Sequence, residues 1–589
     1  MYVRDDLIGG GRIDLGHDQW WKGAVVYQIY PRSFQDSNGD GYGDLEGIRS
    51  RLGYLKNLGV DVLWLSPIYR SPQADNGYDI SDYRDIDPLF GTLEDFDRLL
   101  ADVHALGMKL IMDLVVNHSS DEHPWFVQSR SSKGNPKRDW YYWRPARPGY
   151  RPGEPGAEPN NWGSFFSGSV WEYDEATGEY YLHLFHKKQP DLNWENPEVR
   201  RAVYDMMNWW LDRGVDGFRM DVINLISKTP GLPDGPVPEG GLYGDGFPHY
   251  GHGPRLHEFL AEMHREVFDG RGGTGSGIDA PMTVGETPGV RPDNVTLFTD
   301  PARRELDMVF QFEHVDLGLE NGKFRPRSLA VGELADSLDR WQRAQADRGW
   351  NSLYLDNHDQ PRAVSRFGDE AHRDASATAL ATVVHLLRGT PYIYQGEELG
   401  MTNTVFESLD DFRDVETLRY YQEAVGAGED PEAVLRGLAA MGRDNARTPV
   451  QWDGAAPNAG FTGAVPWLGV NPNYQRINAA AQMGDPSSVH EYYRRLIALR
   501  HSLPVIALGS YERLECEARA VYAYRRTLGE SQLIVVANLS SEPVEPGVLV
   551  DVPTDLVQVL GNGDCARGFE QDLAPWEARV YLRGFTTGA

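Results

Sequence analysis

The sequence KLIMDLVVNH, residues 109–118, holds an apolar run of strand length that ends on the polar pair Asn117-His118. Three later runs have the same character: GFRMDVIN at 217–224, VGET at 284–287 and DNHDQPR at 356–362. In a parallel α/β barrel, reactive groups occupy the C-terminal ends of the strands. The four runs therefore predict one site that combines three carboxylates, two histidines and an arginine.

Strand-like apolar runs alternate with helical patterns along most of the chain. The expected strands cover residues 24–30, 60–65, 109–116, 215–222, 282–285, 306–312, 352–355 and 392–395. After the first strand, five apolar residues recur at steps of three and four and form one helical stripe: Leu45, Ile48, Leu52, Leu55 and Leu58. Further helical patterns cover residues 93–106, 198–212, 256–268 and 489–499. Eight such units predict an α/β fold, a (β/α)8 TIM barrel.

Two stretches depart from this alternation. Residues 119–190 are rich in Trp, Tyr, Gly and Pro and are too long for an ordinary βα loop, so we expect an inserted subdomain after the third strand. After about Pro504 the pattern changes to short β-type runs, which predicts a C-terminal antiparallel β-sandwich over residues 505–589. The barrel then comprises residues 1–118 and 191–504.

Composition and charge exclude several classes of protein. With 589 residues, 41% of them hydrophobic and 11% aromatic, the chain is typical of a large folded enzyme. A formal charge of -30 disfavours nucleic acid and anionic membranes as partners, because both would be repelled. The first twenty residues lack a signal-peptide run, and no later apolar run approaches the ~20 residues of a membrane span. We expect a cytoplasmic protein. A neutral substrate would suit this charge, but the charge taken alone favours the alternative that it only keeps the protein soluble.

The chain has two cysteines, Cys516 and Cys565. They are too few for a disulfide framework or a four-cysteine zinc site, although a single bridge between them stays open. The sequence does not decide the oligomeric state.

Taken in order, with QPDLNW at 189–194 between the first two, the four runs closely resemble the α-amylase superfamily of glycoside hydrolases, in particular its oligo-1,6-glucosidase and α-glucosidase branch. The resemblance extends from about Trp20 to the C-terminus. It implies a retaining, exo-acting α-glucosidase that releases glucose from the non-reducing ends of short oligosaccharides. It also implies a preference for α-1,6 links, as in isomaltose, and no organic cofactor.

Three carboxylates carry the expected chemistry. Retaining cleavage needs a nucleophile and an acid whose carboxyl groups lie ~5 Å apart across the bond. The resemblance makes Asp221 the nucleophile, and Arg219 is a charge partner that would keep this carboxylate ionised. Glu286 ends an apolar run, where desolvation should raise the pKa of its carboxyl group and hold the proton that an acid catalyst delivers. The resemblance assigns Asp359 to stabilising the transition state.

The resemblance also assigns residues that bind the terminal glucose. In NGYDISDY, residues 76–83, Asp79 binds distal hydroxyls and pairs with Arg447. Such a pair would close the pocket behind one sugar and favour exo-action. Tyr83 is expected to stack on the sugar ring.

Four more residues complete the expected binding site. By the resemblance, His118 and His358 bind hydroxyls. Val222 follows the nucleophile, and in the resembling enzymes a valine here accompanies α-1,6 preference whereas a threonine accompanies α-1,4 preference. One apolar contact is worth only ~1–3 kcal/mol of discrimination. Gln360 is a candidate contact for the leaving sugar.

The loop DSNGDGYGD, residues 36–44, alternates oxygen ligands with glycines, a spacing that suits Ca²⁺. The expected ligands are Asp36, Asn38, Asp40, Asp44 and the carbonyl group of Tyr42. An EF-hand is excluded, because Gly47 stands where that motif needs glutamate and the loop follows a strand. The resemblance implies a structural cation, for which Mg²⁺ could substitute, and a turn without an ion is the alternative.

Three other functions stay open on this evidence. A transglucosylase would use the same catalytic residues with a sugar acceptor in place of water. A trehalose-6-phosphate hydrolase would need a Lys or Arg cluster for the phosphate, and Lys187 and Lys188 in the inserted segment are not assigned to that pocket. A non-enzymatic barrel that acts as a membrane-tethered partner would carry a transmembrane segment and tend to lose the carboxylates, so this sequence disfavours it.

Overall fold

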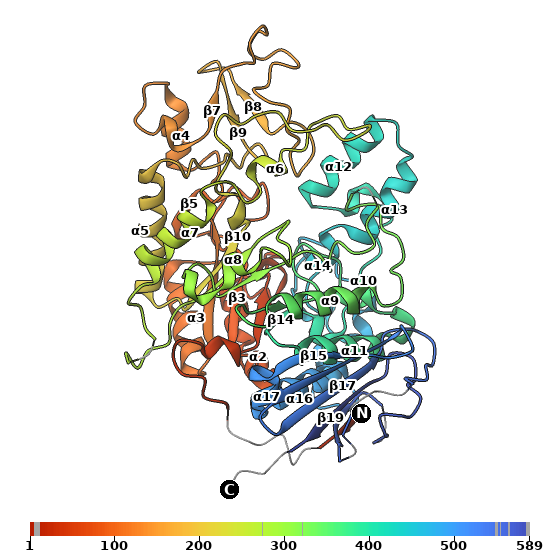
Figure 1. Ribbon diagram of the computed structural model, residues 1–589. Helices are drawn as coiled ribbons and strands as arrows, with labels where there is room; N and C mark the ends of the chain where they lie inside the picture. Colours follow the sequence, from red (N-terminus) through yellow and green to blue (C-terminus); the bar gives the residue numbers. More distant parts are fainter. Residues whose placement is uncertain are drawn as a thin grey trace.

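The computed structural model describes residues 1–4, 12–273, 275–320, 322–547, 552–553, 555–563 and 566–584. Figure 1 shows a barrel in the middle of the molecule, an inserted segment at one end and an antiparallel sheet at the other. The described residues contain no helix long and apolar enough to cross a membrane.

Eight parallel strands form the central sheet, in the order β12-β11-β10-β6-β3-β2-β14-β13. Their bounds are β2 Val26–Ile29, β3 Val62–Leu65, β6 Lys109–Val115, β10 Gly217–Asp221, β11 Met282–Glu286, β12 Met308–Phe310, β13 Ser352–Leu353 and β14 Thr390–Tyr394. A parallel bridge between Val309 and Asn351 joins the two ends of the sheet. The predicted TIM barrel is confirmed, and each of its strands overlaps one of the eight expected runs.

Helices follow the strands and cover the barrel. The longer ones are α1 Leu45–Ser50, α2 Leu52–Leu58, α3 Leu93–Ala105, α5 Pro197–Arg213, α7 Leu256–Met263, α9 Glu333–Ala344, α11 Arg373–His385 and α16 Val489–Ser502. Short helices connect them: α6 Phe247–Tyr250, α8 Thr296–Thr299, α10 Ala363–Phe367, α15 Ala479–Gln482 and α17 Pro504–Leu508. The apolar stripe after β2 lies on two helices, since Arg51 has a non-helical backbone with φ −103°. Helix α3 begins with a capping box between Thr92 and Asp95.

The segment 119–190 contains α4 Pro124–Ser131 and a small antiparallel sheet, β7 Trp143–Arg144, β9 Glu179–Leu182 and β8 Trp171–Asp174. It follows the two-stranded sheet β4 Tyr69–Arg70 and β5 Asp82–Ile86. Its aromatic core includes Trp162 and Trp171 and is continuous with Val222 and Leu225 of the barrel. This shared core fixes the inserted segment above the C-terminal ends of the strands.

A second excursion follows β14 and was not expected from the sequence. It contains α12 Val415–Gly426, α13 Pro431–Met441 and α14 Asp444–Arg447. Phe406, Phe412 and Leu438 belong to an apolar cluster separate from the barrel core, which also takes in Phe324 from the region after β12. In Figure 1, α12 and α13 stand beside the inserted segment, above the same end of the barrel.

The C-terminal region is antiparallel, as predicted. Its six strands have the order β1-β18-β19-β17-β16-β15, with bounds β1 Tyr2–Val3, β15 Ser510–Leu514, β16 Val521–Leu528, β17 Ser531–Asn538, β18 Val557–Gly561 and β19 Ala578–Arg583. The sheet contacts α11 and α17, and Val544, Leu573 and Phe569 pack in a cluster on its strands. Strand β1 at the N-terminal end of the chain was not expected in this sheet. Cys565 lies outside the described residues, so its possible bridge to Cys516 stays a prediction.

Candidate active site

One cavity of about 220 Å³ lies at the C-terminal ends of the barrel strands. Its lining includes Asp221 at the end of β10, Glu286 at the end of β11, and Asp359 and Gln360 in the loop after β13. His118, which follows β6, lines it as well. The four motifs that the sequence analysis grouped therefore do meet, as expected of strand ends on one rim.

Arg219 links three of the carboxyl groups. Its Nη1 lies 2.9 Å from Asp113 Oδ1 and 2.6 Å from Asp221 Oδ1, and its Nη2 lies 2.8 Å from Glu286 Oε2. Strand geometry explains the arrangement, because Arg219 and Asp221 are two residues apart and point to the same side of β10. Asp113 is the partner of Arg219 in the register of β6 and β10. One buried guanidinium thus stands against three buried acids.

Burial and nearby charges give the three expected catalytic carboxyl groups different pKa values. Burial raises the pKa of Glu286 to about 8, against the opposing effect of Arg219. Burial raises the pKa of Asp221 to about 7, again opposed by Arg219. For Asp359 burial would also raise the pKa, but His358, Arg443 and Arg447 outweigh it and hold the pKa well below its ordinary value. Near neutral pH, Glu286 is thus the group that keeps a proton, and Asp359 is the group that keeps its charge.

This order of pKa values predicts a narrow bell-shaped pH profile for kcat/KM. Activity should rise with pH as Asp221, with a pKa of about 7, loses its proton, and fall as Glu286, with a pKa of about 8, loses its own. Because the two groups interact, the limbs report the pair and not single residues. Initial rates from pH 5 to about 10 on isomaltose, whose leaving sugar needs a proton from the acid, measure this profile. Glu286→Gln should remove the alkaline limb, and a limb that persists would contradict the assignment of the proton.

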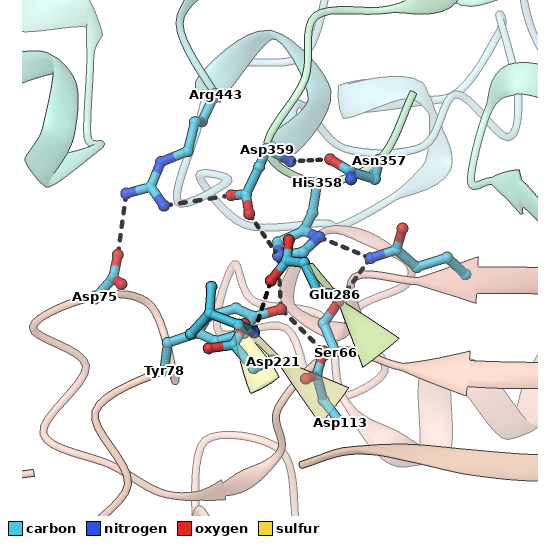
Figure 2. Close-up of polar contacts among 12 residues, drawn as sticks. Ser66, Asp75, Tyr78, Asp113, Asp221, Glu286, Asn357, His358, Asp359 and Arg443 are labelled. Carbon is cyan, nitrogen blue, oxygen red and sulfur yellow. Dashed lines mark hydrogen bonds and ion pairs between the residues drawn. The ribbon is translucent and has the colours of Figure 1, made fainter. Parts of the chain in front are cut away.

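A second charge cluster lies at one side of the cavity, and Figure 2 shows its Arg443 between Asp75 and Asp359. Arg443 Nη2 lies 3.0 Å from Asp75 Oδ1 and 2.6 Å from Asp414 Oδ1. Its Nη1 lies 3.3 Å from Asp359 Oδ1, and its guanidinium stands 4.9 Å above the ring of Phe166. Asp75, Arg443 and Phe166 all line the cavity. They form a wall that joins the loop after β3, the inserted segment and the second excursion.

His358 is held in one orientation beneath Asp359. Gln28 Nε2 lies 2.8 Å from its Nδ1, while its Nε2 lies 2.6 Å from Tyr78 Oη and 3.2 Å from Asp359 Oδ2. An amide N–H can only donate, so Nδ1 accepts and Nε2 carries the proton toward Tyr78 and Asp359. Tyr78 stacks on the imidazole at 5.2 Å and donates to Asp113. Burial lowers the pKa of His358 to about 3, so the ring is neutral.

Three residues expected at the sugar lie elsewhere. Asp79 accepts hydrogen bonds from the backbone N–H groups of Ala74 and Asp75, at 2.8 and 3.0 Å, and does not line the cavity. Tyr83 is buried, and its hydroxyl group donates to the His118 carbonyl. The predicted pair of Asp79 with Arg447 is wrong.

Arg447 lies behind the wall, 2.8 Å from Asp359 Oδ1 and 3.2 Å from Asp414 Oδ1. The pair that closes the cavity is Asp75 with Arg443, four residues earlier in each segment, and the tyrosine at the cavity is Tyr78. The first segment holds two aspartates, Asp75 and Asp79, and the second holds two arginines, Arg443 and Arg447. Residue type alone could not choose between them.

Val222 and Gln360 line the cavity as expected, whereas Arg219 and His358 lie behind its lining residues. Val222 has a left-handed backbone, with φ 36° and ψ 40°, which is rare for a β-branched residue. This conformation directs its backbone N–H toward Glu286 Oε2 at 3.1 Å. Val222 therefore contacts the expected acid through its backbone and the cavity through its side chain.

Sequence reasoning missed much of the remaining lining. The inserted segment contributes Phe165, Phe166, Phe185 and Gln189, the region after β12 contributes Phe312, Val315, Asp316, Leu319 and Lys323, and the second excursion contributes Glu416 and Met441. Lys323 is paired with Glu416 at 2.7 Å. Most of these residues sit in loops without periodicity, and Glu416 and Met441 lie on the unexpected helices α12 and α13. Gln189 opens the QPDLNW run, to which no role had been assigned.

The loop 36–44 is closed by its own hydrogen bonds. Asp36 accepts from the N–H groups of residues 38, 39 and 41, Asn38 accepts from the N–H of Asp40, and Asp40 from that of Tyr42. Asp44 caps α1 by accepting from Gly47 N at 2.6 Å. No three acidic, histidine or cysteine side chains converge as a metal cluster within the described ranges. The oxygens still suit a hard cation, because an ionised carboxylate that accepts one or two hydrogen bonds keeps further lone pairs.

The chain is similar to known proteins over most of its length. Residues 28–509 match the family described as "Alpha amylase, catalytic domain". An oligo-1,6-glucosidase of Parageobacillus thermoglucosidasius is 57% identical over 571 residues, which cover 95% of this chain and 98% of that protein. Two solved structures superpose with TM-scores of 0.88: a trehalose-6-phosphate hydrolase of Bacillus licheniformis, 45% identical, and the trehalulose synthase of Pseudomonas mesoacidophila MX-45, 44% identical. Each alignment covers 96% of this chain and 99% of the solved one.

Proposed function

Because this chain belongs to the α-amylase family of glycoside hydrolases, we propose that it releases glucose, with retention, from the non-reducing ends of short α-1,6-linked oligosaccharides. It is an α-glucosidase of the oligo-1,6-glucosidase type. The observation that carries the proposal is the meeting of Asp221 and Glu286 on Arg219, beside a cavity with one side closed by Asp75 and Arg443.

The arrangement supports a double displacement. Asp221 attacks the anomeric carbon while Glu286 protonates the glycosidic oxygen, and Glu286 then takes a proton from the water that releases glucose. Val222 N–H and Arg219 hold the Glu286 carboxyl group in position for both steps. Asp359 stays negative beside the sugar and stabilises the positive charge that develops in the transition state.

The closed wall supports exo-action. Arg443 is bonded to Asp75, Asp359 and Asp414 at once. Moving it aside would break the ion pair of buried Asp75 and leave Asp359 and Asp414 with Arg447. A sugar chain that continued beyond the terminal glucose would need this space. Substrates therefore enter by their non-reducing ends.

A neutral substrate fits the charges of the cavity. Lys323 is neutralised by Glu416, and Arg443 is surrounded by four carboxylates. A phosphate on the substrate would have to break these pairs. We therefore favour isomaltose-like oligosaccharides over trehalose-6-phosphate.

The proposed function is tested by measuring which glycosidic linkage the enzyme prefers. Initial rates on isomaltose, panose, maltose, sucrose, trehalose, trehalose-6-phosphate and dextran should show glucose release from isomaltose and panose above that from maltose. Val222→Thr should narrow the isomaltose-to-maltose ratio about tenfold, since a hydroxyl group at this position adds a hydrogen-bonding partner worth ~1.4 kcal/mol. Val222→Ile is the matched control that keeps the side chain apolar and β-branched.

Each other outcome has a definite meaning. A wild-type preference for maltose, or a ratio that Val222→Thr leaves unchanged, would contradict the role of this residue. Dominant hydrolysis of trehalose-6-phosphate would replace the proposed substrate. Accumulation of longer oligosaccharides or isomerised sucrose at the expense of glucose would make the enzyme a transglucosylase with the same catalytic residues.

We also propose that the loop 36–44 binds one Ca²⁺, for which Mg²⁺ can substitute, through Asp36, Asn38, Asp40, Asp44 and the Tyr42 carbonyl group. A cation bound only to the folded state stabilises it by mass action, so Ca²⁺ should raise Tm by a few degrees over a chelator-treated sample. Activity of still-folded enzyme should change less, because the loop holds none of the catalytic groups. Asp40→Ala should abolish the Tm response, and Glu46→Ala on α1 is the control. Equal Tm values with and without Ca²⁺ in the wild-type protein would leave the loop a simple turn.

A further inference from the structure

A short strap of the inserted segment reaches across the cavity wall. Gly163 and Ser169 form an antiparallel bridge, and Ser164 N donates to Gly168 O at 2.9 Å, so residues 163–169 make a tight hairpin. Phe165 and Phe166 lie at its tip and line the cavity. Phe165 stacks on Phe185 at 4.9 Å, which fixes the aromatic side of the strap to its own segment.

The polar side of the strap is bonded to α12. Gly168 N donates to Glu423 Oε2 at 2.8 Å, and Arg419 Nη2 donates to Ser167 O at 3.2 Å. Glu416, Arg419 and Glu423 are spaced three and four residues apart, so they lie on one face of α12. The same helix face thus contributes Glu416 to the cavity and two residues to the strap.

These bonds join two parts of the chain that have separate cores. The aromatic cluster of the inserted segment includes Trp162 and Trp171, whereas α12 packs with Phe412 and Leu438. Arg443 stacks on Phe166 and holds Asp75, so the position of the strap decides whether the ring completes the wall. Hydrogen bonds at a half-buried position are weak enough individually to open locally.

We propose that Glu423 and Arg419 latch the strap to α12 and thereby restrict the enzyme to unsubstituted non-reducing ends. The inference rests on the proposed exo-glucosidase function and assigns its end-specificity to two residues outside the cavity. With the latch closed, Phe166 fills the space behind the terminal glucose. With the latch open, the strap can move and a substituent on that glucose can enter.

The test compares two substrates in the full chain. One is 4-nitrophenyl α-glucoside, and the other is the same glucoside with its O4 and O6 blocked by an ethylidene group. In the Glu423→Ala/Arg419→Ala double variant the blocked-to-unblocked ratio of kcat/KM should rise about tenfold over the wild type. Glu423→Gln, which can still accept from Gly168 N–H, should keep the wild-type ratio, and Gln422→Ala on the exposed side of α12 is the control.

Hydrogen exchange of the peptide that contains residues 163–169 reports the latch itself, since Gly168 N–H is one of its bonds. Faster exchange together with the raised ratio supports the proposal. Faster exchange with an unchanged ratio overturns the link to specificity, and unchanged exchange overturns the latch. Failure of the proposed function would be seen separately, as absent hydrolysis of isomaltose by the wild-type enzyme.

Discussion

Asp221→Asn should lower kcat by more than about 10⁴-fold, and Glu286→Gln by about 10²–10⁴-fold, while both variants stay folded. The first loses its nucleophile and the second its acid, and each substitution replaces one of the three carboxyl groups that share Arg219. Because these amides are close in shape to the carboxyl groups they replace, the hydrogen bonds to Arg219 and Val222 can persist on the remaining carbonyl oxygen. The loss is therefore chemical and not structural.

Three measurements check this prediction. Melting curves should overlay within a few degrees, and Asp82→Asn, an exposed carboxylate of β5, should retain full activity. Glu286→Gln should recover activity on glucosyl fluoride, whose leaving group needs no proton. Early-time NMR of the wild-type reaction should detect α-glucose first, and initial β-glucose would contradict the double displacement.

Arg443→Met should lower kcat/KM about 30- to 5,000-fold, the range of ~2–5 kcal/mol expected when one partner of a buried charge pair is removed. The guanidinium pairs with Asp75 and shares Asp359 with Arg447, so its removal breaks the ion pair of Asp75 and weakens the hold on Asp359. Asp75→Asn should cost a comparable amount. The double variant should lose less than the sum, because each single change already breaks the shared contact.

Stability and selectivity separate this role from a general loss of folding. Arg443→Lys keeps a positive charge and should retain Tm better than Arg443→Met. Asp79→Asn should change kcat/KM much less, since Asp79 does not line the cavity and bonds to residues of its own loop, through Ser71 Oγ and the N–H groups of Ala74 and Asp75. If Asp79→Asn were the more damaging change, the wall would have been assigned to the wrong carboxylate.

The barrel and its three carboxylates were predictable because they depend on regular structure. Apolar runs identify buried strands, and Asp221 and Glu286 are the last residues of two of them, so their place on the rim follows from the strand geometry. Asp75 and Arg443 lie in loops, where no period fixes which side chain faces inward. Each residue has a neighbour of the same type four positions later in the chain. The resemblance was therefore assigned to Asp79 and Arg447 in place of Asp75 and Arg443.

The second excursion was hidden for a related reason. Helices α12 and α13 bury an apolar cluster against each other. The spacing of apolar residues in the sequence is the same for a helix that covers a barrel and for one that stands above it. Only its contacts, such as Arg443 with Asp75, reveal that it forms part of the cavity. The strap and Lys323 were missed because their neighbours come from distant parts of the sequence.

The order of strands in the central sheet bears on how the protein is made. Val26 of β2 pairs with Tyr392 of β14, so during synthesis β2 waits with one edge unpaired until most of the chain has left the ribosome. Such an edge exposes N–H and C=O groups that other chains can bind, and contacts this distant form slowly. Tyr2 of β1 stays unpaired longer still, because its partner Gly561 of β18 is synthesised near the end of the chain. Soluble yield is therefore expected to depend on the rate of translation and on chaperones that cover the open edge of β2, and to improve when expression is slowed.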